Sequence, residues 1–369
     1  MLEEKEKRAP NALNVYRVIA ALCVFLLHAT IFDAFDQREG VSPFLFFLFP
    51  SAWGGVFMFM TLGGFLAGKG FSSGRYEMSV KGVLDYYKKR VVRILLPAWA
   101  YLFLVILLVY PTMFTVEIEK LLPIVFLYFN GAESVNGIGH TWYVFTALHL
   151  YLLTPFFHFF FAKCKKRGNG SLWGLMIGII AAGLVFRLCM ALYISSLPGT
   201  EHGSVWYNDI YTPFWGNLDL WLSGMILSEI DRSKVRRSRS VRILAGIALA
   251  VLLLVSAWFS YTNNGGYSWY LSPTLYAVVS LFFFDTFDRE GGAKGNTPID
   301  SFAGYTFEFY LFHSLVFMCV CKMFASYELP VWGLHLILIF LGFAITLLLS
   351  VAFHRIFERK QKQINPSKG

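Results

Sequence analysis

The sequence predicts an all-α, polytopic membrane bundle of about ten transmembrane helices, with one further segment that is re-entrant or interfacial. The chain of 369 residues is 56% hydrophobic and 15% charged, whereas a soluble globular domain has about 25% charged residues. Its apolar residues form continuous runs long enough to cross a bilayer as helices. These runs do not alternate between apolar and polar residues, as the strands of a membrane barrel would.

Ten apolar runs are bounded by polar or basic loops, and we expect each to be a span. They cover about 13–32, 44–67, 94–110, 142–162, 172–194, 214–230, 243–261, 271–287, 302–324 and 331–353. A shorter apolar run at 118–130 has only about half the length of a span. We therefore divide the chain into an N-terminal tail (1–12), one membrane domain (13–356) and a basic C-terminal tail (357–369).

The basic residues, which give a net charge of +9, cluster in the two tails and in loops at 69–93, 163–167, 231–242 and 288–294. The positive-inside rule places such loops in the cytoplasm. All of them fall on that side if the 118–130 segment does not cross the membrane, and both termini are then cytoplasmic. Nucleic-acid binding would instead require a basic patch on a folded domain, so we expect membrane lipid as a partner and no nucleic acid.

The start of the chain and its cysteines exclude two other classes. No cleavage site of the A-x-A kind follows Leu27, so we interpret the first apolar run as an uncleaved span. The cysteine spacing matches neither a zinc site nor a disulfide framework, and we expect no metal. The five cysteines are Cys23, Cys164, Cys189, Cys319 and Cys321.

Two ionisable residues, Arg17 and His28, lie in the first span. Their separation makes about three helical turns, so they share one face and lie roughly 16 Å apart along the axis. Intramembrane ionisable residues are costly and usually face a cavity or a partner. Because His is the usual general base near neutral pH, we predict that His28 transfers a proton while Arg17 lies nearer the cytoplasm. The alternative is a snorkelling Arg and a packing His.

A basic run enters the third span and contains Lys89, Arg90 and Arg93. Arg90 and Arg93 are three residues apart and are expected to share a helix face. Because Arg binds phosphate in a bidentate manner, this helix start suits a polyphosphate ligand. The same residues would also serve as a positive-inside anchor.

Polar and aromatic residues mark two later spans, and we predict substrate or oxyanion contacts there. An aromatic belt is the alternative for the first span, and interhelical hydrogen bonding is the alternative for the second. The residues concerned are His140, Trp142 and Tyr143 at the start of one span, and Glu308 and His313 inside the other.

Three further features concern packing. The segment from Gly63 to Gly70 nearly matches a phosphate-binding loop, but it lacks the Ser or Thr and ends an apolar helix. We interpret Gly64 and Gly68 as a site of close helix packing. Arg187 and Asp219 are charges inside apolar runs, and they either line the cavity or pair with each other.

Four stretches together resemble the bacterial membrane-bound acyltransferase family 3, whose members O-acylate glycans and other acceptors. Four such motifs in this order, over nearly the whole chain, are fairly specific. They are Arg17 and His28 with ten residues between them, the basic run 89–94 with Pro97, His140-x-Trp142-Tyr143 followed by Tyr151 and Pro155, and Tyr310-Leu311-x-His313. The chain departs from many relatives at Gly63, where they have Ser, and at Ala147 and Leu148, where they have acidic residues.

The resemblance implies an acyl-CoA donor, with acetyl as the expected acyl group, and a hydroxyl acceptor on a glycan or another molecule. An anionic donor would dock from the cytoplasm against Lys89, Arg90, Arg93 and Arg17. His28 would then accept the proton of the acceptor hydroxyl. His140 and Tyr143 are the two expected oxyanion donors.

A transporter or exporter of a glycan or small metabolite is the alternative function, with Arg17 and His28 as a proton relay. A structural or sensory membrane module would need no such aligned pair. We expect a multi-pass protein of the bacterial plasma membrane, and the sequence is compatible with a homo-oligomer.

Overall fold

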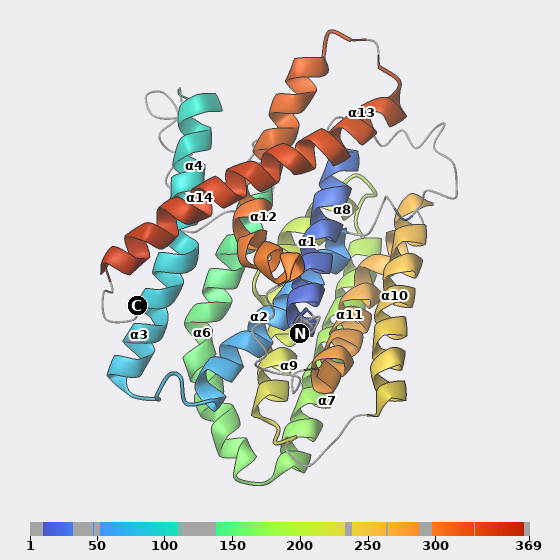
Figure 1. Cartoon of the computed structure of the whole chain (residues 1–369). Helices are drawn as coiled ribbons and strands as arrows, with labels where there is room; N and C mark the ends of the chain where they lie inside the picture. Colours follow the sequence, from blue (N-terminus) through green and yellow to red (C-terminus); the bar gives the residue numbers. More distant parts are fainter. Residues whose placement is uncertain are drawn as a thin grey trace, which may run out of the picture.

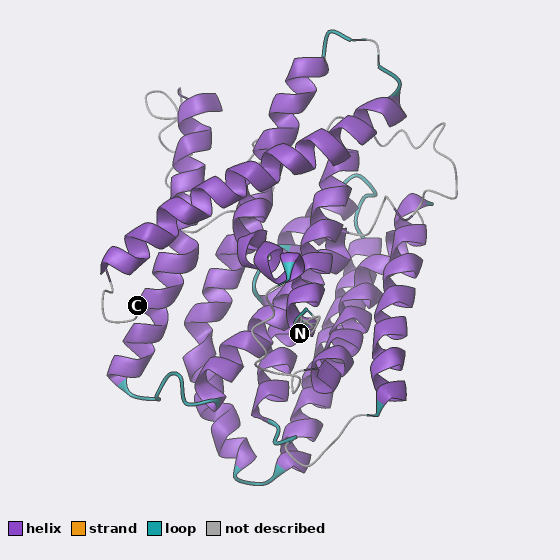
Figure 2. Cartoon of the chain, in the orientation of Figure 1, coloured by secondary structure: helices purple, strands orange, loops and turns teal. Residues whose placement is uncertain are grey.

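A computed structural model describes residues 10–31, 52–109, 138–232, 238–262, 265–287, 297–327 and 329–364, together with Phe47 and Pro111. Over these residues all of the regular secondary structure is helical, and there is no strand (Figure 2). The prediction of an all-α helical bundle is confirmed. The expected partial segment at 118–130 lies outside the described residues.

Nine helices in the described ranges are long and apolar enough to cross a membrane. Two of them contain a π-helical turn, at Val91–Leu95 between α3 and α4 and at Leu338–Gly342 between α13 and α14. The helices of the bundle (Figure 1) are α1 (Ala12–Ile31), α2 (Ala52–Ser72), α3 (Val80–Arg90), α4 (Leu96–Val109), α6 (Trp142–Lys165), α7 (Asn169–Ser195), α8 (His202–Val205), α9 (Leu218–Glu229), α10 (Arg239–Tyr261), α11 (Gly265–Phe287), α12 (Pro298–Phe324), α13 (Val331–Ile337) and α14 (Phe343–Ile364).

The span expected at 214–230 is a short helix, α9, of 12 residues. A π-helical turn (Trp206–Tyr211) and a 3-10 turn (Trp215–Asn217) precede it, on either side of Pro213. The Asn217 side-chain amide donates to the Tyr211 and Pro213 carbonyls at 2.7 and 3.1 Å. Irregular backbone is tolerated in membrane proteins where it is buried in protein. In this segment the side chain of Asn217 satisfies two backbone carbonyls.

Helices α2 and α9 cross in contact at the centre of the bundle (Figure 1). A side chain at Gly64 would overlap the backbone carbonyl of Trp221, and one at Gly68 would overlap the hydroxyl of Ser228. On the facing helix, a side chain at Gly224 would overlap the carbonyl of Thr61. The interpretation of Gly64 and Gly68 as a close-packing site is confirmed, since small residues allow membrane helices to approach closely.

A buried ion pair joins three helices. The Arg187 guanidinium of α7 donates to both carboxylate oxygens of Asp219 in α9, at 3.0 and 2.6 Å, and also to Thr274 Oγ1 of α11 at 3.1 Å. Both charged side chains are almost fully buried. Of the two alternatives for these charges, pairing with each other is the one that the structure shows.

Helices α2, α6 and α9 end, and α3, α7 and α10 begin, at the lower end of the bundle in Figure 1, next to the basic sequence stretches 69–93, 163–167 and 231–242. Phe71 at the end of α2 stacks on His158 near the end of α6, with ring centroids 5.0 Å apart. Lys165 Nζ of α6 lies 3.4 Å from Glu229 Oε2 of α9. We call this the basic end, and the grouping is what the positive-inside rule predicts.

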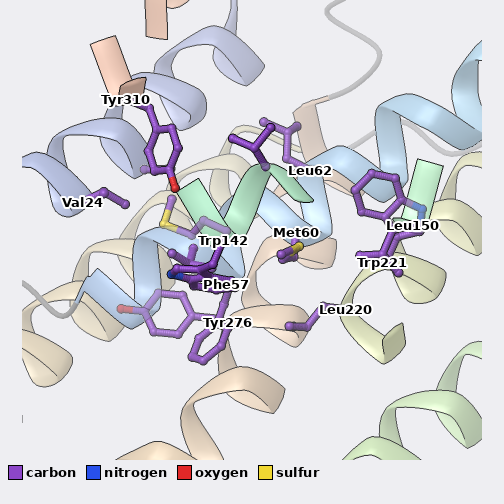
Figure 3. Packing of buried hydrophobic residues seen from close by; sticks show 14 of the residues in the cluster. Val24, Phe57, Met60, Leu62, Trp142, Leu150, Leu220, Trp221, Tyr276 and Tyr310 are labelled. Atoms are coloured by element: carbon purple, nitrogen blue, oxygen red, sulfur yellow. The ribbon is translucent and has the colours of Figure 1, made fainter. Parts of the chain in front are cut away.

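The apolar core surrounds the centre of the molecule. Figure 3 shows Val24 of α1, Phe57 of α2, Trp142 of α6 and Tyr310 of α12 gathered around one region of it. Helices α1 and α12 also carry Arg17, His28, Glu308 and His313, and His140 directly precedes α6, so the core fixes these side chains relative to one another.

Candidate active site

Three histidines from separate helices meet inside the bundle. His313 of α12 lies between His28 of α1 and His140 of the 3-10 turn that begins α6. Its ring centroid is 4.8 Å from that of His28 and 4.9 Å from that of His140. His140 and His313 are buried, and His28 is half-buried. We call these residues the histidine cluster.

Parallel packing of α1 and α12 positions two of the three rings. Asn14 Nδ2 donates to Asp300 Oδ1 at 2.8 Å near the starts of both helices. Asp300 also closes a capping box with Thr297 at the start of α12. About three turns further along α1, and about two and a half turns further along α12, Phe25 packs against Phe309 with ring centroids 5.1 Å apart. This alignment brings His28 beside His313.

Each ring of the histidine cluster donates one N–H to a backbone carbonyl. His28 Nδ1 lies 2.9 Å from the Val24 oxygen, His313 Nδ1 2.6 Å from the Tyr310 oxygen, and His140 Nε2 3.1 Å from the Leu311 oxygen. A carbonyl oxygen can only accept, so these contacts assign the tautomer of each neutral ring. The remaining nitrogens are therefore lone-pair acceptors.

Two of those acceptor nitrogens, His140 Nδ1 and His313 Nε2, are buried and have no hydrogen-bond partner among the described residues. Buried polar groups without partners are costly, and each of these two lone pairs is able to accept a hydrogen bond. In the described part of the chain, no group of His, Cys, Asp and Glu side chains has the arrangement needed to hold a metal ion.

Tyrosines enclose the cluster. The Tyr310 hydroxyl donates to the backbone carbonyl of His140, which ties the start of α6 to α12. The Tyr143 ring lies 5.6 Å from that of Tyr310, and the Tyr101 ring lies 5.8 Å from that of His140.

Arg17 faces the interior of the bundle, on the same continuous helix as His28. It interacts electrostatically with the hydroxyls of Tyr143 and Tyr151, both on α6. The prediction that Arg17 and His28 share a face, roughly 16 Å apart at about 1.5 Å per residue, suits this unbroken α1. Arg17 therefore lies between the histidine cluster and the basic end.

Arg90 continues this polar arrangement toward the basic end. Its guanidinium carbon lies 4.4 Å from the ring centre of Tyr151 and 4.9 Å from that of Tyr86. Within the described residues, no carboxylate lies at ion-pair distance from Arg90. Arg90 is thus a cation held by aromatic faces, an arrangement that leaves it able to bind an anion.

Together these contacts form a series that we call the polar track. It runs from the basic end to the histidine cluster, and each member contacts or interacts with the next. Its members are Arg90, Tyr151, Arg17, Tyr143, Tyr310, His140, His313 and His28.

Comparison with known families identifies the fold and the chemistry. A family model described as an acyltransferase domain matches residues 11–355. The chain belongs to acyltransferase family 3. No curated protein and no solved structure matches the chain. The match covers every residue of the polar track, so these residues lie within the domain of a membrane acyltransferase.

The other basic residues of this acyltransferase lie apart from the polar track. Lys89 Nζ lies 4.5 Å from the ring centre of Tyr76, at the basic end. Arg93 is exposed, whereas Arg90 is half-buried. A π-helical turn at Val91–Leu95 follows Arg90 and contains Arg93.

Two other predicted contacts of the acyltransferase point away from the histidine cluster. Glu308 pairs with His354 of α14, with Oε1 2.7 Å from Nδ1. Trp142 packs against Tyr211, with ring centroids 4.6 Å apart, in an aromatic part of the core. His354 was missed because it lies 46 residues further along the chain, and nothing local marks it as a partner.

Sequence reasoning gave no role to two tyrosines of the polar track, Tyr151 and Tyr310. Both occur in the stretches that resemble the family, and that was the available signal. Their contacts depend on helices that are far apart in the sequence, since Tyr310 reaches the backbone of His140 across 170 positions.

Proposed function

We propose that this membrane acyltransferase transfers an acyl group, expected to be acetyl, from cytoplasmic acyl-CoA to a hydroxyl of a glycan or another acceptor. The polar track is the observation that supports this proposal best. It joins a cationic entrance to a cluster of acceptor nitrogens inside one domain, which is what an anionic thioester donor and a proton-transfer step require.

The donor enters at the basic end in this proposal. Arg90 binds a phosphate of the coenzyme, with Lys89 and Arg93 contributing charge around it. The extended arm of the coenzyme then follows Tyr151 and Arg17 inward. This places the thioester beside the histidine cluster, since the track leads there.

His28 is the general base in this proposal. Its Nδ1–H is held by the Val24 carbonyl, which leaves Nε2 to accept the proton of the acceptor hydroxyl. The acceptor oxygen then attacks the thioester carbonyl carbon, and the carbon–sulfur bond breaks. His28 is also the least buried of the three rings, so it is the one that a second substrate reaches most easily.

Tyr143 is the better of the two expected oxyanion donors. Neutral His140 gives its single N–H to the Leu311 carbonyl, which leaves no proton for an oxyanion. The Tyr143 hydroxyl has a proton to donate and interacts with Arg17, whose positive charge favours an oxyanion nearby.

A transporter would use the same cavity charges as a proton relay but would bind no thioester. Membership of the acyltransferase family favours the enzyme over the transporter. The exposed apolar side chains of the bundle suit contact with lipid, and we propose the bacterial plasma membrane as the location.

The test uses the purified full-length protein in detergent. Calorimetry measures acetyl-CoA binding, and a thiol-reactive dye measures thiol release with and without a hydroxyl acceptor. We expect saturable binding by the wild type, weaker binding by an Arg90→Ala, Arg93→Ala double variant, and normal binding without transfer by His28→Gln. A folded wild-type protein that binds no acyl-CoA would overturn the proposal and favour transport.

A further inference from the structure

We propose that the three rings of the histidine cluster hold the transferred proton in common, and that His313 carries it between His28 and the leaving thiolate. This inference rests on the proposed acyl transfer at the same site. It makes His313 a proton carrier, where the sequence predicted only a substrate or oxyanion contact.

The orientation of the rings is the first argument. His313 is the central ring, with the other two rings at 4.8 and 4.9 Å. Each backbone contact locks one nitrogen of a ring as a donor, and so leaves His28 Nε2, His140 Nδ1 and His313 Nε2 as acceptors. Three neutral rings therefore offer three lone pairs and no proton to share.

The cost of that neutral state is the second argument. His140 Nδ1 and His313 Nε2 are buried without partners in the described part of the chain, and such atoms are costly. No hydrogen bond joins the neutral rings, so in this proposal the rings turn when one proton is added, and the protonated ring then donates to the lone pair of its neighbour in a charge-assisted hydrogen bond. A second proton would place two positive charges within one buried site, which is unfavourable.

Among the described residues, the groups that face the cluster are tyrosines and Arg17, and they leave the sharing of the proton to the three rings. The Tyr310 hydroxyl of α12 is committed to the His140 carbonyl. Tyr143 of α6 interacts with Arg17 of α1, and the Tyr101 ring of α4 is T-shaped to that of His140, at an interplanar angle of 74°. The charge of Arg17 lies about three turns from His28 along α1. None of these groups is a carboxylate that would trap the proton.

The proton is conserved through the reaction. The acceptor O–H bond breaks and its proton passes to His28 Nε2, while the oxygen forms a bond to the thioester carbon. The carbon–sulfur bond then breaks, with the electron pair staying on sulfur. The proton passes through His313 to the thiolate, and this gives an ester, free coenzyme A and three neutral rings.

A first experiment compares His313→Gln with His149→Gln, in the full-length protein with saturating acetyl-CoA and acceptor. Gln keeps a donor and an acceptor but cannot carry a proton. His149 is a matched control, because its Nδ1 also donates to a backbone carbonyl of its own helix, that of Phe145 at 2.7 Å, and it lies outside the cluster against Phe214. The readout is kcat for thiol release as a function of pH.

We expect His313→Gln to lower kcat at least about tenfold and to move the acid limb of its pH profile to lower pH by about one unit, which is the size of one charge-assisted hydrogen bond. The sign follows because a ring that can no longer share its proton gives it up more readily. His149→Gln should leave both kcat and the acid limb of the pH profile unchanged. A lower kcat with an unmoved pH profile would mean that His313 acts only in packing, and would overturn the proposal.

A second experiment does not depend on turnover or on the stability of a variant. The ring nitrogens of ¹⁵N-histidine in the wild-type protein are followed by NMR as the pH is lowered. We expect the signals of all three cluster rings to shift together, in one step that adds one proton. Titration of His28 alone would overturn sharing. A wild-type protein that shares the proton but releases no thiol would instead contradict the proposed acyl transfer.

Discussion

The Arg90 guanidinium lies over the Tyr151 ring at 4.4 Å, and the hydroxyl of the same tyrosine interacts with Arg17. One aromatic side chain therefore separates the cation at the basic end from the cation inside the bundle. Since no carboxylate of the described residues lies at ion-pair distance from Arg90, its guanidinium can bind a phosphate without first breaking an ion pair with any of them. The polar track therefore leads from Arg90 at the basic end, through Tyr151, to Arg17 inside the bundle.

The first prediction concerns Arg90. Arg90→Ala should raise the KM for acetyl-CoA about tenfold, which corresponds to the loss of one charge-assisted contact. Arg93→Ala is the matched control, because Arg93 is exposed and its change should have the smaller effect. Steady-state kinetics at varied acetyl-CoA separates the two. Equal effects of the two variants would indicate general charge attraction at the basic end.

The second prediction concerns Tyr143. Tyr143→Phe should lower kcat about 100-fold with little change in the KM for acetyl-CoA, since an oxyanion donor acts mainly in the transition state. The ring and its contact with Tyr310 remain in this variant. Rapid-mixing measurements of thiol release test the chemical step. If KM rises while kcat stays the same, Tyr143 only binds substrate.

The membrane architecture could be predicted from the sequence because hydropathy and basic loops act locally along the chain. The 214–230 segment shows the limit of that approach. Its apolar composition matches a span, yet Pro213 and the turn capped by Asn217 shorten the helix to α9. Composition does not reveal a break whose backbone carbonyls are satisfied by the side chain of Asn217, four and six residues further along the chain.

Part of the site could be predicted because some of its residues are related by a local pattern along one helix. Arg17 and His28 share one helix, so their spacing gave their relative position. The meeting of His28 with His313 depends on α1 and α12, and the pairing of Glu308 with His354 depends on α12 and α14. Such contacts are set by helix packing, which no local pattern encodes.

The third prediction concerns the α2–α9 crossing. Gly64→Ala should destabilise the protein by about 1–3 kcal/mol or more, because the added methyl overlaps the Trp221 carbonyl and the helices must separate. Gly178→Ala on α7 is the control, since nothing lies within 4 Å of its added methyl. Thermal unfolding in detergent compares the two. Equal unfolding temperatures would mean that the crossing is looser than the structure shows.

The last prediction concerns the buried pair of Arg187 and Asp219. Removing one partner leaves an uncompensated charge, so Arg187→Met should cost about 3–5 kcal/mol of stability. Replacing both, as Arg187→Met with Asp219→Leu, should restore much of that loss, because hydrophobic residues can replace a buried pair at little cost. The Thr274 hydroxyl would then lose the hydrogen bond that Arg187 donates to it, so we expect the recovery of stability to be incomplete. Unfolding in detergent provides the measurement, and a double variant less stable than the single one would show that the two charges act independently. The KM for acetyl-CoA of the folded double variant should match that of the wild type, since the pair joins α7, α9 and α11 and lies outside the polar track.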